Sequence, residues 1–136
     1  MARSARKFDA KEAFLAFAEW RLRIQFAQSS RKSVLFFRRS RDHSIVWMLV
    51  MRGYYMDAPP SVRECQEKAT CSRPTTRKML ADAQARGFVD VRAAADDSRK
   101  RLVYPSKRAI EEYESMVMGY LSLWDTLGLE HKSGRR

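Results

Sequence analysis

The most informative part of this sequence is residues 64–106, which read ECQEKATCSRPTTRKMLADAQARGFVDVRAAADDSRKRLVYPS. A short helical stretch precedes a turn at Thr70-Cys71, and a second helix runs from Ser72 to Gly87. Two short apolar strands around a polar tip follow this second helix. The order of helix, turn, helix and hairpin predicts a winged helix-turn-helix.

Capping residues mark the boundaries of these helices. Ser61 can cap the first helix, and Glu64 at the third position completes a capping box. Ser72 can cap the second helix, and Pro74 falls in its first turn, where a missing N–H costs little. Gly87 supplies the left-handed residue that commonly ends a helix. These signals all agree with the predicted helix-turn-helix.

Further helices are predicted before this segment. The first runs from residue 8 to about 29 with Asp9 as a possible N-cap, and its apolar residues spread over more than one face. We therefore expect it to be covered on two sides. Residues 34–37 form an apolar run that fits either a helix or a strand. A helix over residues 42–56, capped by Asp42, then ends at the prolines 59–60.

The hairpin leads into a last helix. We expect strands at 88–91 and 102–104, with Pro105 closing the second strand and Ser106 capping the helix. Apolar residues of this helix recur at heptad spacing, namely Ile110, Tyr113, Val117, Tyr120, Trp124 and Leu127. This seam, together with Phe14 of the first helix, predicts a dimer interface. The alternative is that the seam packs onto the chain's own first helix.

The length predicts one domain. The chain has 136 residues, enough for a single modest core, which we place at residues 8–129. Its DNA-binding core would span about 42–106, and its dimerisation helices about 8–29 and 106–128. A basic arm at residues 1–7 and a basic tail at 130–136 would lie outside it.

The charge balance points to a polyanionic partner. Lys and Arg number 27 against 16 acidic residues, which gives a net charge of +11. Such a field favours DNA, RNA or an anionic membrane over a merely soluble basic protein. The sequence has neither a signal-peptide pattern nor an apolar run long enough to cross a membrane, so we expect a cytoplasmic, nucleoid-associated protein without membrane contact.

Residues 61–106 resemble the winged-helix core of the MarR family of bacterial transcription regulators. The stretch SRPTTRKML at 72–80 is similar to the opening of the family's recognition helix, and RGFV at 86–89 to its exit. Asp97-Ser98-Arg99 matches the family's Asp-x-Arg motif in the wing. The resemblance implies a homodimer held by terminal helices, double-stranded DNA as partner, and often a small-molecule or oxidant signal.

The helical period separates two faces of the recognition helix. Thr76, Met79, Leu80 and Ala83 share one face and are expected to pack inward. The remaining residues of the first turns would face the major groove, where Arg bonds guanine and Thr contacts thymine. The candidates are Ser72, Arg73, Thr75, Arg77 and Lys78. The alternative is an ordinary solvated basic face.

Basic residues also surround the tip of the hairpin. An Arg at a wing tip can enter the minor groove, where the potential is most negative. The candidates are Arg92, Arg99, Lys100 and Arg101, and Asp97 can fix the Arg99 guanidinium. The alternative is a surface ion pair that merely stabilises the hairpin.

Nothing in the sequence favours an enzyme or a cofactor. It shows no Ser/His/Asp set, no Gly-rich phosphate loop and no metal-ligand cluster, and the spacing of Cys65 and Cys71 does not suit zinc. Both cysteines are expected to be buried and inert, with a redox switch beside the recognition helix as the alternative.

We therefore expect a homodimeric, sequence-specific regulator that binds double-stranded DNA. The alternatives are sequence-independent nucleic-acid binding and a winged-helix module for protein interaction. A small-molecule effector would need a pocket. Aromatic residues that could line one are Phe14, Trp20, Phe36, Trp47, Tyr54 and Tyr55, although aromatics more often form core.

Overall fold

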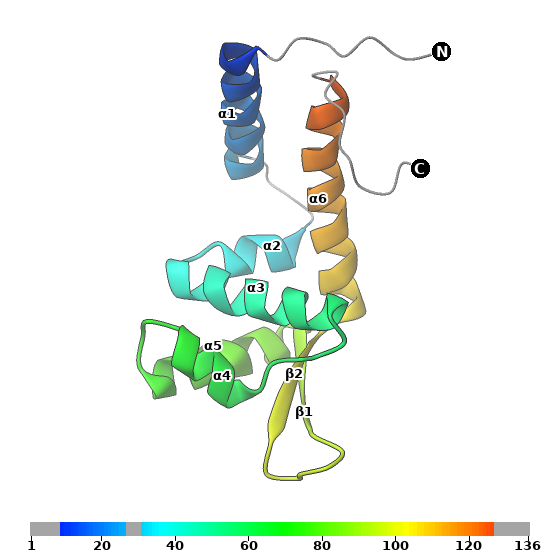
Figure 1. Cartoon of the computed structure of the whole chain (residues 1–136). Helices are drawn as coiled ribbons and strands as arrows, with labels where there is room; N and C mark the ends of the chain where they lie inside the picture. The colour runs from blue at the N-terminus through cyan, green and yellow to red at the C-terminus, as the bar shows by residue number, and fades with distance from the viewer. Residues whose placement is uncertain (1–8, 27–30, 127–136) are drawn as a thin grey trace, which may run out of the picture. The chain divides into compact units, whose positions relative to one another are not determined.

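A computed structural model describes residues 9–26 and 31–126, except for the side chains at positions 25, 26, 124 and 126. Within these ranges the chain is mainly helical with one two-stranded hairpin (Figure 1). The elements in order are α1 (Ala10–Phe26), α2 (Lys32–Phe37), α3 (Arg41–Tyr55), α4 (Val62–Lys68), α5 (Arg73–Ala85), β1 (Val89–Ala93), β2 (Arg101–Pro105) and α6 (Lys107–Thr126). The predicted fold class, a winged helix-turn-helix with flanking helices, is confirmed.

The chain divides into two units. Residues 30–113 form one, which we call the winged-helix unit, and residues 1–29 with 114–136 form the other, the terminal unit. Helix α6 contributes its first turns to the former and its remainder to the latter. The predicted arm, the tail and Leu127 lie outside the described residues.

The predicted caps of the helix-turn-helix are confirmed. The Ser61 hydroxyl accepts from the Glu64 amide at 3.0 Å, and the Glu64 carboxylate accepts from the Ser61 amide at 3.2 Å. Ser72 caps α5 by accepting from the Thr75 amide at 3.2 Å. Gly87 has φ +78°, so it provides the left-handed exit from α5. Local sequence signals therefore suffice for this part of the fold.

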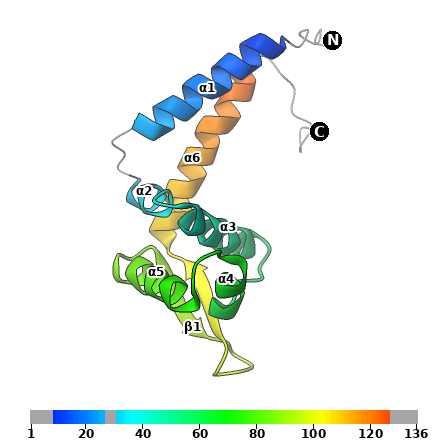
Figure 2. The same cartoon turned by 90° about the vertical axis from the view of Figure 1, so that its left-hand side faces the viewer.

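The hairpin is antiparallel and extends past the ends of α4 and α5 (Figure 2). Its register pairs Val91 with Val103 and ends with Ala93 opposite Arg101. A preceding segment adds to its edge, because the Val103 amide donates to the Pro60 carbonyl at 2.8 Å. This contact ties the start of the helix-turn-helix to the wing, and no local sequence pattern predicts it.

Aromatic and branched side chains from α2 and α3 form the core of the winged-helix unit. The apolar run at 34–37 is helical, and Phe36 and Phe37 are both buried. Phe37 stacks on Trp47 at 5.8 Å, and Phe36 and Phe37 both contact Phe88, which follows the recognition helix. The aromatic core thus fixes α2 and α3 against the end of α5.

The predicted start of α3 is wrong. Ser40, which has an extended backbone, is the N-cap and accepts from the His43 amide at 3.1 Å. Asp42 lies two residues later, inside the helix, and its carboxylate contacts a distant turn. Both residue types can cap a helix, and the sequence did not show that Asp42 had another partner.

The start of α2 is capped by a residue from another helix. The side chain of its N-cap residue, Arg31, makes no capping hydrogen bond. Instead, the Glu112 carboxylate of α6 accepts from the Ser33 amide at 2.9 Å and from the Ser33 hydroxyl. Burial acts to raise the pKa of Glu112, but the bonds from Ser33 and Arg108 outweigh it and lower that pKa.

The terminal unit contains α1 and the later turns of α6. Asp9 accepts from the Lys11 and Glu12 amides at 3.1 and 3.3 Å, as expected of the N-cap of α1. The expectation that α1 is covered on two sides is not met within the described residues, since its Phe14 side chain is 71% exposed. Leu15, Phe17 and Leu22 are also exposed. Helix α1 therefore carries an apolar surface that the described part of the chain does not cover.

Candidate nucleic-acid interface

Four buried side chains fix the orientation of the recognition helix α5. Thr76, Met79, Leu80 and Ala83 are all buried, which confirms the predicted inward face. The helix begins at Arg73 and has Pro74 in its first turn, as the sequence predicted. Because one face is held by the core, the opposite face and the first turn must point to solvent.

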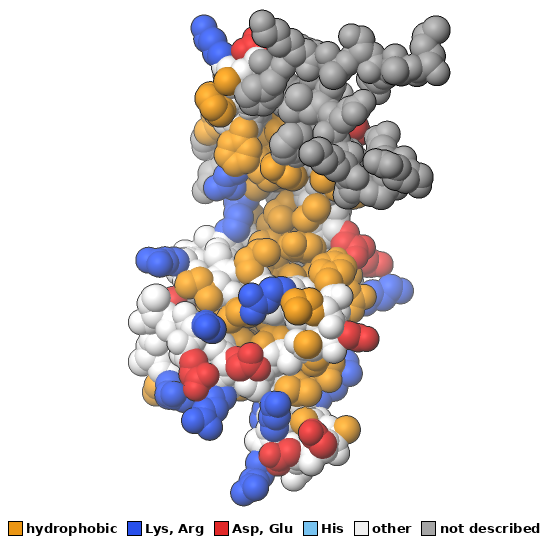
Figure 3. Space-filling view, viewed as in Figure 1, with side chains coloured by type: hydrophobic (Ala, Val, Ile, Leu, Met, Phe, Trp, Pro, Cys, Tyr) orange, Lys and Arg blue, Asp and Glu red, His pale blue; other side chains and the backbone are white. Residues whose placement is uncertain are grey.

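The candidate residues for reading DNA lie on that open face. Ser72, Arg73, Thr75, Arg77 and Lys78 are all exposed. Within the described ranges, Arg73, Arg77 and Lys78 form no ion pair, so their charges are available to a polyanion. Figure 3 shows basic side chains gathered over the α4 and α5 end of the unit and on the wing.

A buried glutamine holds the reading end of α5 against α4. The Gln66 side-chain amide donates to the Arg73 carbonyl at 3.2 Å, and Gln66 is buried. A buried polar side chain needs such a partner, so the contact also stabilises the glutamine. Sequence reasoning missed this residue, although a polar side chain on the inner face of a short helix was an available signal.

The four wing candidates differ in how tightly the hairpin holds them. Arg92 donates to Asp90 at 2.6 Å and lies over the Tyr104 ring at 4.4 Å, so its guanidinium is engaged along the strands. Arg99, Lys100 and Arg101 are exposed at the tip. The structure therefore brings three of the four cations to the tip.

Asp97 orders the wing chiefly through the backbone. Its carboxylate accepts from the Arg99 amide at 3.0 Å, whereas its ion pair with the Arg99 guanidinium spans 3.8 Å. The Arg99 side chain is 93% exposed. The predicted Asp97–Arg99 pair thus exists, but it leaves the guanidinium accessible.

The turn between α4 and α5 is held from α3. The Asp42 carboxylate accepts from the Thr70 amide at 2.6 Å and from the Thr70 hydroxyl at 2.9 and 3.0 Å. The Thr70 amide, followed by its hydroxyl, lowers the pKa of Asp42 below its ordinary value. Asp42 is therefore ionised at neutral pH and acts as a fixed acceptor for the turn.

The two thiols have different surroundings. Cys65 is fully buried, and burial raises the pKa of its thiol to about 12, as expected of an inert core residue. Cys71 is only half-buried, and its sulfur lies 3.2 Å from the hydroxyl of the buried Thr76. The expectation that both thiols are buried therefore holds for Cys65 alone.

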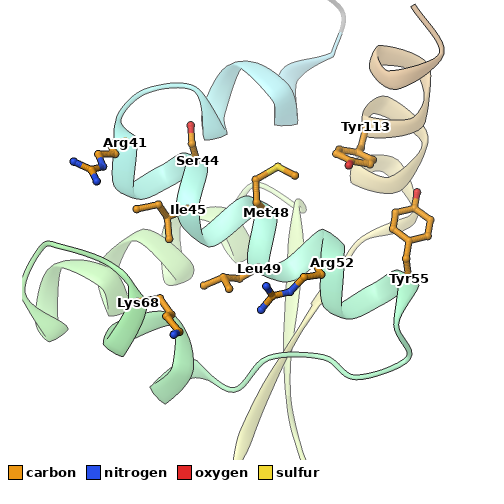
Figure 4. A pocket seen from close by; sticks show the side chains of 9 residues that line it. All are labelled: Arg41, Ser44, Ile45, Met48, Leu49, Arg52, Tyr55, Lys68 and Tyr113. Atoms are coloured by element: carbon orange, nitrogen blue, oxygen red, sulfur yellow. The ribbon is translucent and has the colours of Figure 1, made fainter. Parts of the chain in front are cut away.

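An apolar groove runs along the outer side of α3 (Figure 4). Ile45, Met48 and Leu49 form its floor, and the cavity measures about 830 Å³. Arg41, Arg52 and Lys68 stand at its rim, and none of them forms an ion pair with another described residue. Tyr55 and Tyr113 line its far end.

The aromatic residues proposed to line a pocket are dispersed. Tyr55 lines the groove and Phe36 lines a second cavity beside Phe88, while Trp47 is buried in the core of the winged-helix unit. Tyr54 stacks edge-on against Tyr55 at the surface. Phe14 and Trp20 belong to the terminal unit. Aromatic composition alone therefore did not identify the cavity.

The predicted dimer seam is partly engaged within the chain. Tyr113 contacts Trp47 edge-on at 5.4 Å in the winged-helix unit, and Tyr120 contacts Trp20 at 5.1 Å in the terminal unit. A Cβ added at Gly119 would lie 3.6 Å from Nε1 of the same Trp20 ring, an ordinary contact distance. Ile110 and Val117 are half-buried, and the structure does not describe the Trp124 side chain or Leu127. Packing on the chain's own first helix thus accounts for part of the seam.

Two kinds of feature are absent from the described residues. No group of three or more His, Cys, Asp or Glu side chains is placed to hold a metal ion there. No helix in those ranges is long and apolar enough to cross a membrane.

Solved structures of transcription regulators share this fold. The chain is similar to MepR of S. aureus in complex with DNA, at 10% identity and a TM-score of 0.60 over 86% of this chain and 88% of that one. MepR bound to ethidium bromide gives 11% identity and a TM-score of 0.63 over 88% and 81%. Transcriptional regulator Tm0710 from Thermotoga maritima gives 13% and 0.54 over 86% and 72%.

The chain therefore has the winged-helix fold of the MarR-type, DNA-binding regulators, which confirms the resemblance noted in residues 61–106. No family model matches the sequence, and no curated protein matches it either.

Proposed function

We propose that this chain is a transcription regulator that binds specific double-stranded DNA as a homodimer. The observation that carries the proposal is the division of α5: one face is buried, while the first turn and the other face expose hydroxyls and cations that form no ion pair with the described residues. A relative in fold, MepR, has been solved in complex with DNA. As a bacterial regulator it would act in the cytoplasm, on nucleoid DNA.

Each part of the winged-helix unit has a role in this proposal. Helix α5 would enter the major groove, where Arg73, Arg77 and Thr75 contact base edges and Ser72 with Lys78 contact phosphates. Arg99, Lys100 and Arg101 at the wing tip would enter or flank the minor groove. Arg92, held along the strands, would add a phosphate contact. Residues 42–106 thus form the DNA-binding core.

The terminal helices would supply the dimer. The exposed side chains of α1, Phe14 and Leu22 among them, form an apolar surface that a second copy can cover. The seam residues of α6 with Trp124 and Leu127 would complete the interface. Two copies double the number of base contacts and match a two-fold symmetric site.

Selection from a random DNA pool tests the proposal directly. We expect enriched sequences with two related half-sites about 10 base pairs apart, or a multiple of that spacing. Enrichment without a motif would support the sequence-independent alternative. Absence of any salt-dependent DNA binding would support the protein-interaction alternative.

We further propose that the groove on α3 receives a small organic effector. Its apolar floor and three unpaired rim cations, Arg41, Arg52 and Lys68, fit an amphipathic anion. MepR has been solved with ethidium, an organic cation, and the rim charges here predict the opposite preference. Calorimetric titrations of the protein with naphthoate and, separately, with ethidium test this proposal. Arg52→Glu is expected to weaken the binding of naphthoate. Tighter binding of ethidium than of naphthoate would refute the choice of ligand charge.

A further inference from the structure

One contact joins α3 to the turn of the helix-turn-helix. Asp42 and Thr70 are 28 residues apart, and the single carboxylate accepts both the Thr70 amide and the Thr70 hydroxyl. Asp42 lies in the first turn of α3, where the positive end of the helix dipole also favours its charge. Thr70 stands between the end of α4 at Lys68 and the start of α5 at Arg73.

We propose that Asp42 is a positioning residue for DNA recognition: by holding Thr70 it fixes the direction in which α5 presents its first turn. The inference rests on the proposed function, since it assigns a role in reading DNA. Asp42 itself would touch no nucleotide.

Polar contacts hold the two ends of α5 in addition to its buried face. Gln66 holds the Arg73 carbonyl from the side of α4. At the far end of the helix, Asp82 bonds Arg86 at 2.9 Å and pairs with Arg39 at 3.7 Å. The bonds from Thr70 to Asp42 join α3 to the turn that precedes the reading end.

The turn also connects to the buried face of α5. Cys71 follows Thr70 directly, and its sulfur lies 3.2 Å from the Thr76 hydroxyl. That hydroxyl donates to the Ser72 carbonyl at 3.3 Å, and Thr76 has no exposed surface. A displacement of Thr70 would thus be passed to the cap and first turn of the recognition helix.

Because this contact is exposed, its effect on the orientation of α5 can be separated from its effect on folding stability. The Asp42–Thr70 bonds lie at the surface, so water can replace them when either partner is removed. Loss of the contact should therefore cost little folding free energy. It should still matter for recognition, because a bidentate base contact depends on the placement of the helix.

Electrostatics and positioning predict opposite effects of a substitution at Asp42 on specific DNA binding, so one measurement distinguishes them. Asp42→Ala removes the acceptor for Thr70 together with a negative charge of the winged-helix unit, so pure electrostatics would strengthen binding to every DNA. Positioning predicts the opposite for the selected site: about tenfold weaker binding, which corresponds to the loss of a single good contact. Binding to random DNA should stay equal or become tighter.

The variants can be matched closely. Thr70→Val removes the hydroxyl while keeping the branched shape, and Thr70→Ser keeps the hydroxyl and should retain selectivity. Asp57→Asn is the charge control, because Asp57 is an exposed acid of the same unit and its φ of +58° suits Asn. We expect Asp42→Ala and Thr70→Val to lose selectivity non-additively, since both remove the bond from the Thr70 hydroxyl to Asp42.

The measurements are anisotropy titrations with the selected and a random duplex, thermal unfolding, and amide hydrogen exchange without DNA. Selective loss of specific binding, with faster exchange in residues 70–76, supports the inference. Parallel losses on both duplexes, or unchanged exchange, overturn it. If the wild-type protein has no preferred duplex, the proposed function fails, and hydrogen exchange still decides whether Asp42 orders the turn.

Discussion

Single residues of α5 differ in where their partners lie. Thr76 and Leu80 are buried inside the chain. Arg77 and Lys78 lie between them in the sequence, but they are exposed and have no ionic partner among the described residues. The helical period explains this, because neighbouring positions point about 100° apart. Residues without an internal partner are those for which an external one is predicted.

Arg77→Ala should weaken binding to the selected site more than to random DNA. A guanidinium bonded to a base edge contributes about 1–3 kcal/mol of discrimination, which a phosphate contact does not. Lys100→Ala at the wing tip is the matched control and should weaken both equally. Titration of both duplexes measures the ratio, and equal losses for Arg77→Ala would refute its assignment to a base.

An added methyl group should change folding stability by different amounts at three glycines. A Cβ at Gly53 would lie 2.7 Å from the Ala58 carbonyl oxygen, because α3 closes there against the following loop. Gly53→Ala should destabilise the winged-helix unit by about 1–3 kcal/mol. Gly87→Ala meets no neighbour and should cost about 1 kcal/mol through its positive φ alone. Gly119→Ala has neither problem, and thermal unfolding that ranks it with Gly53→Ala would contradict this account.

At the scale of elements, α2 depends on a cap from α6. Its six residues are too few for an independent helix, and its N-terminus is satisfied by Glu112 through Ser33. Ser33 is fully buried, so the bond replaces water that cannot reach it. The aromatic pair Phe36-Phe37 then secures the helix to the core.

The cap predicts how stability depends on pH. The pKa of Glu112 is lower in the folded chain than its ordinary value of 4.5. Its contribution is therefore complete above pH 4.5 and is lost as pH falls through the folded pKa. Glu112→Gln should reduce stability at neutral pH by about 1–2 kcal/mol and flatten the acid limb. Urea unfolding at several pH values measures this, and Glu111→Gln, on the exposed neighbour, is the matched control.

At the scale of the whole molecule, the terminal unit leaves apolar surface uncovered. Phe14 and Leu22 on α1 are exposed, as is Leu121 on α6. Surfaces of this kind on a folded chain generally mark a partner interface. A second copy is the partner that a two-fold symmetric DNA site would require.

Phe14→Glu should therefore shift the protein to a monomer, because it places a charge in the proposed interface. The monomer should retain random-DNA binding through its intact winged-helix unit and lose most of its affinity for the paired half-sites. Light scattering after gel filtration and DNA titration check both effects. Phe14→Leu, which keeps an apolar side chain, is the control, and a Phe14→Glu dimer would remove this residue from the interface.

Local chemistry made part of this molecule predictable from its sequence. Capping boxes, the glycine exit and the helical period depend on residues within a few positions of one another, so Ser61, Ser72, Gly87 and the inward face of α5 were all predicted correctly. The charge of +11 and the wing motif likewise indicate a polyanionic partner without any knowledge of tertiary contacts.

Long-range contacts were settled by the folded chain. Asp42 reads as a cap because Asp commonly is one, and its bond to Thr70 exists only when two segments 28 residues apart meet. Two further hydrogen bonds, from Ser33 to Glu112 and from Gln66 to Arg73, likewise form only when separate helices meet. The same holds for the groove on α3. Such pairings depend on tertiary packing, which periodicity and spacing do not encode, and they set how the predicted recognition helix is held.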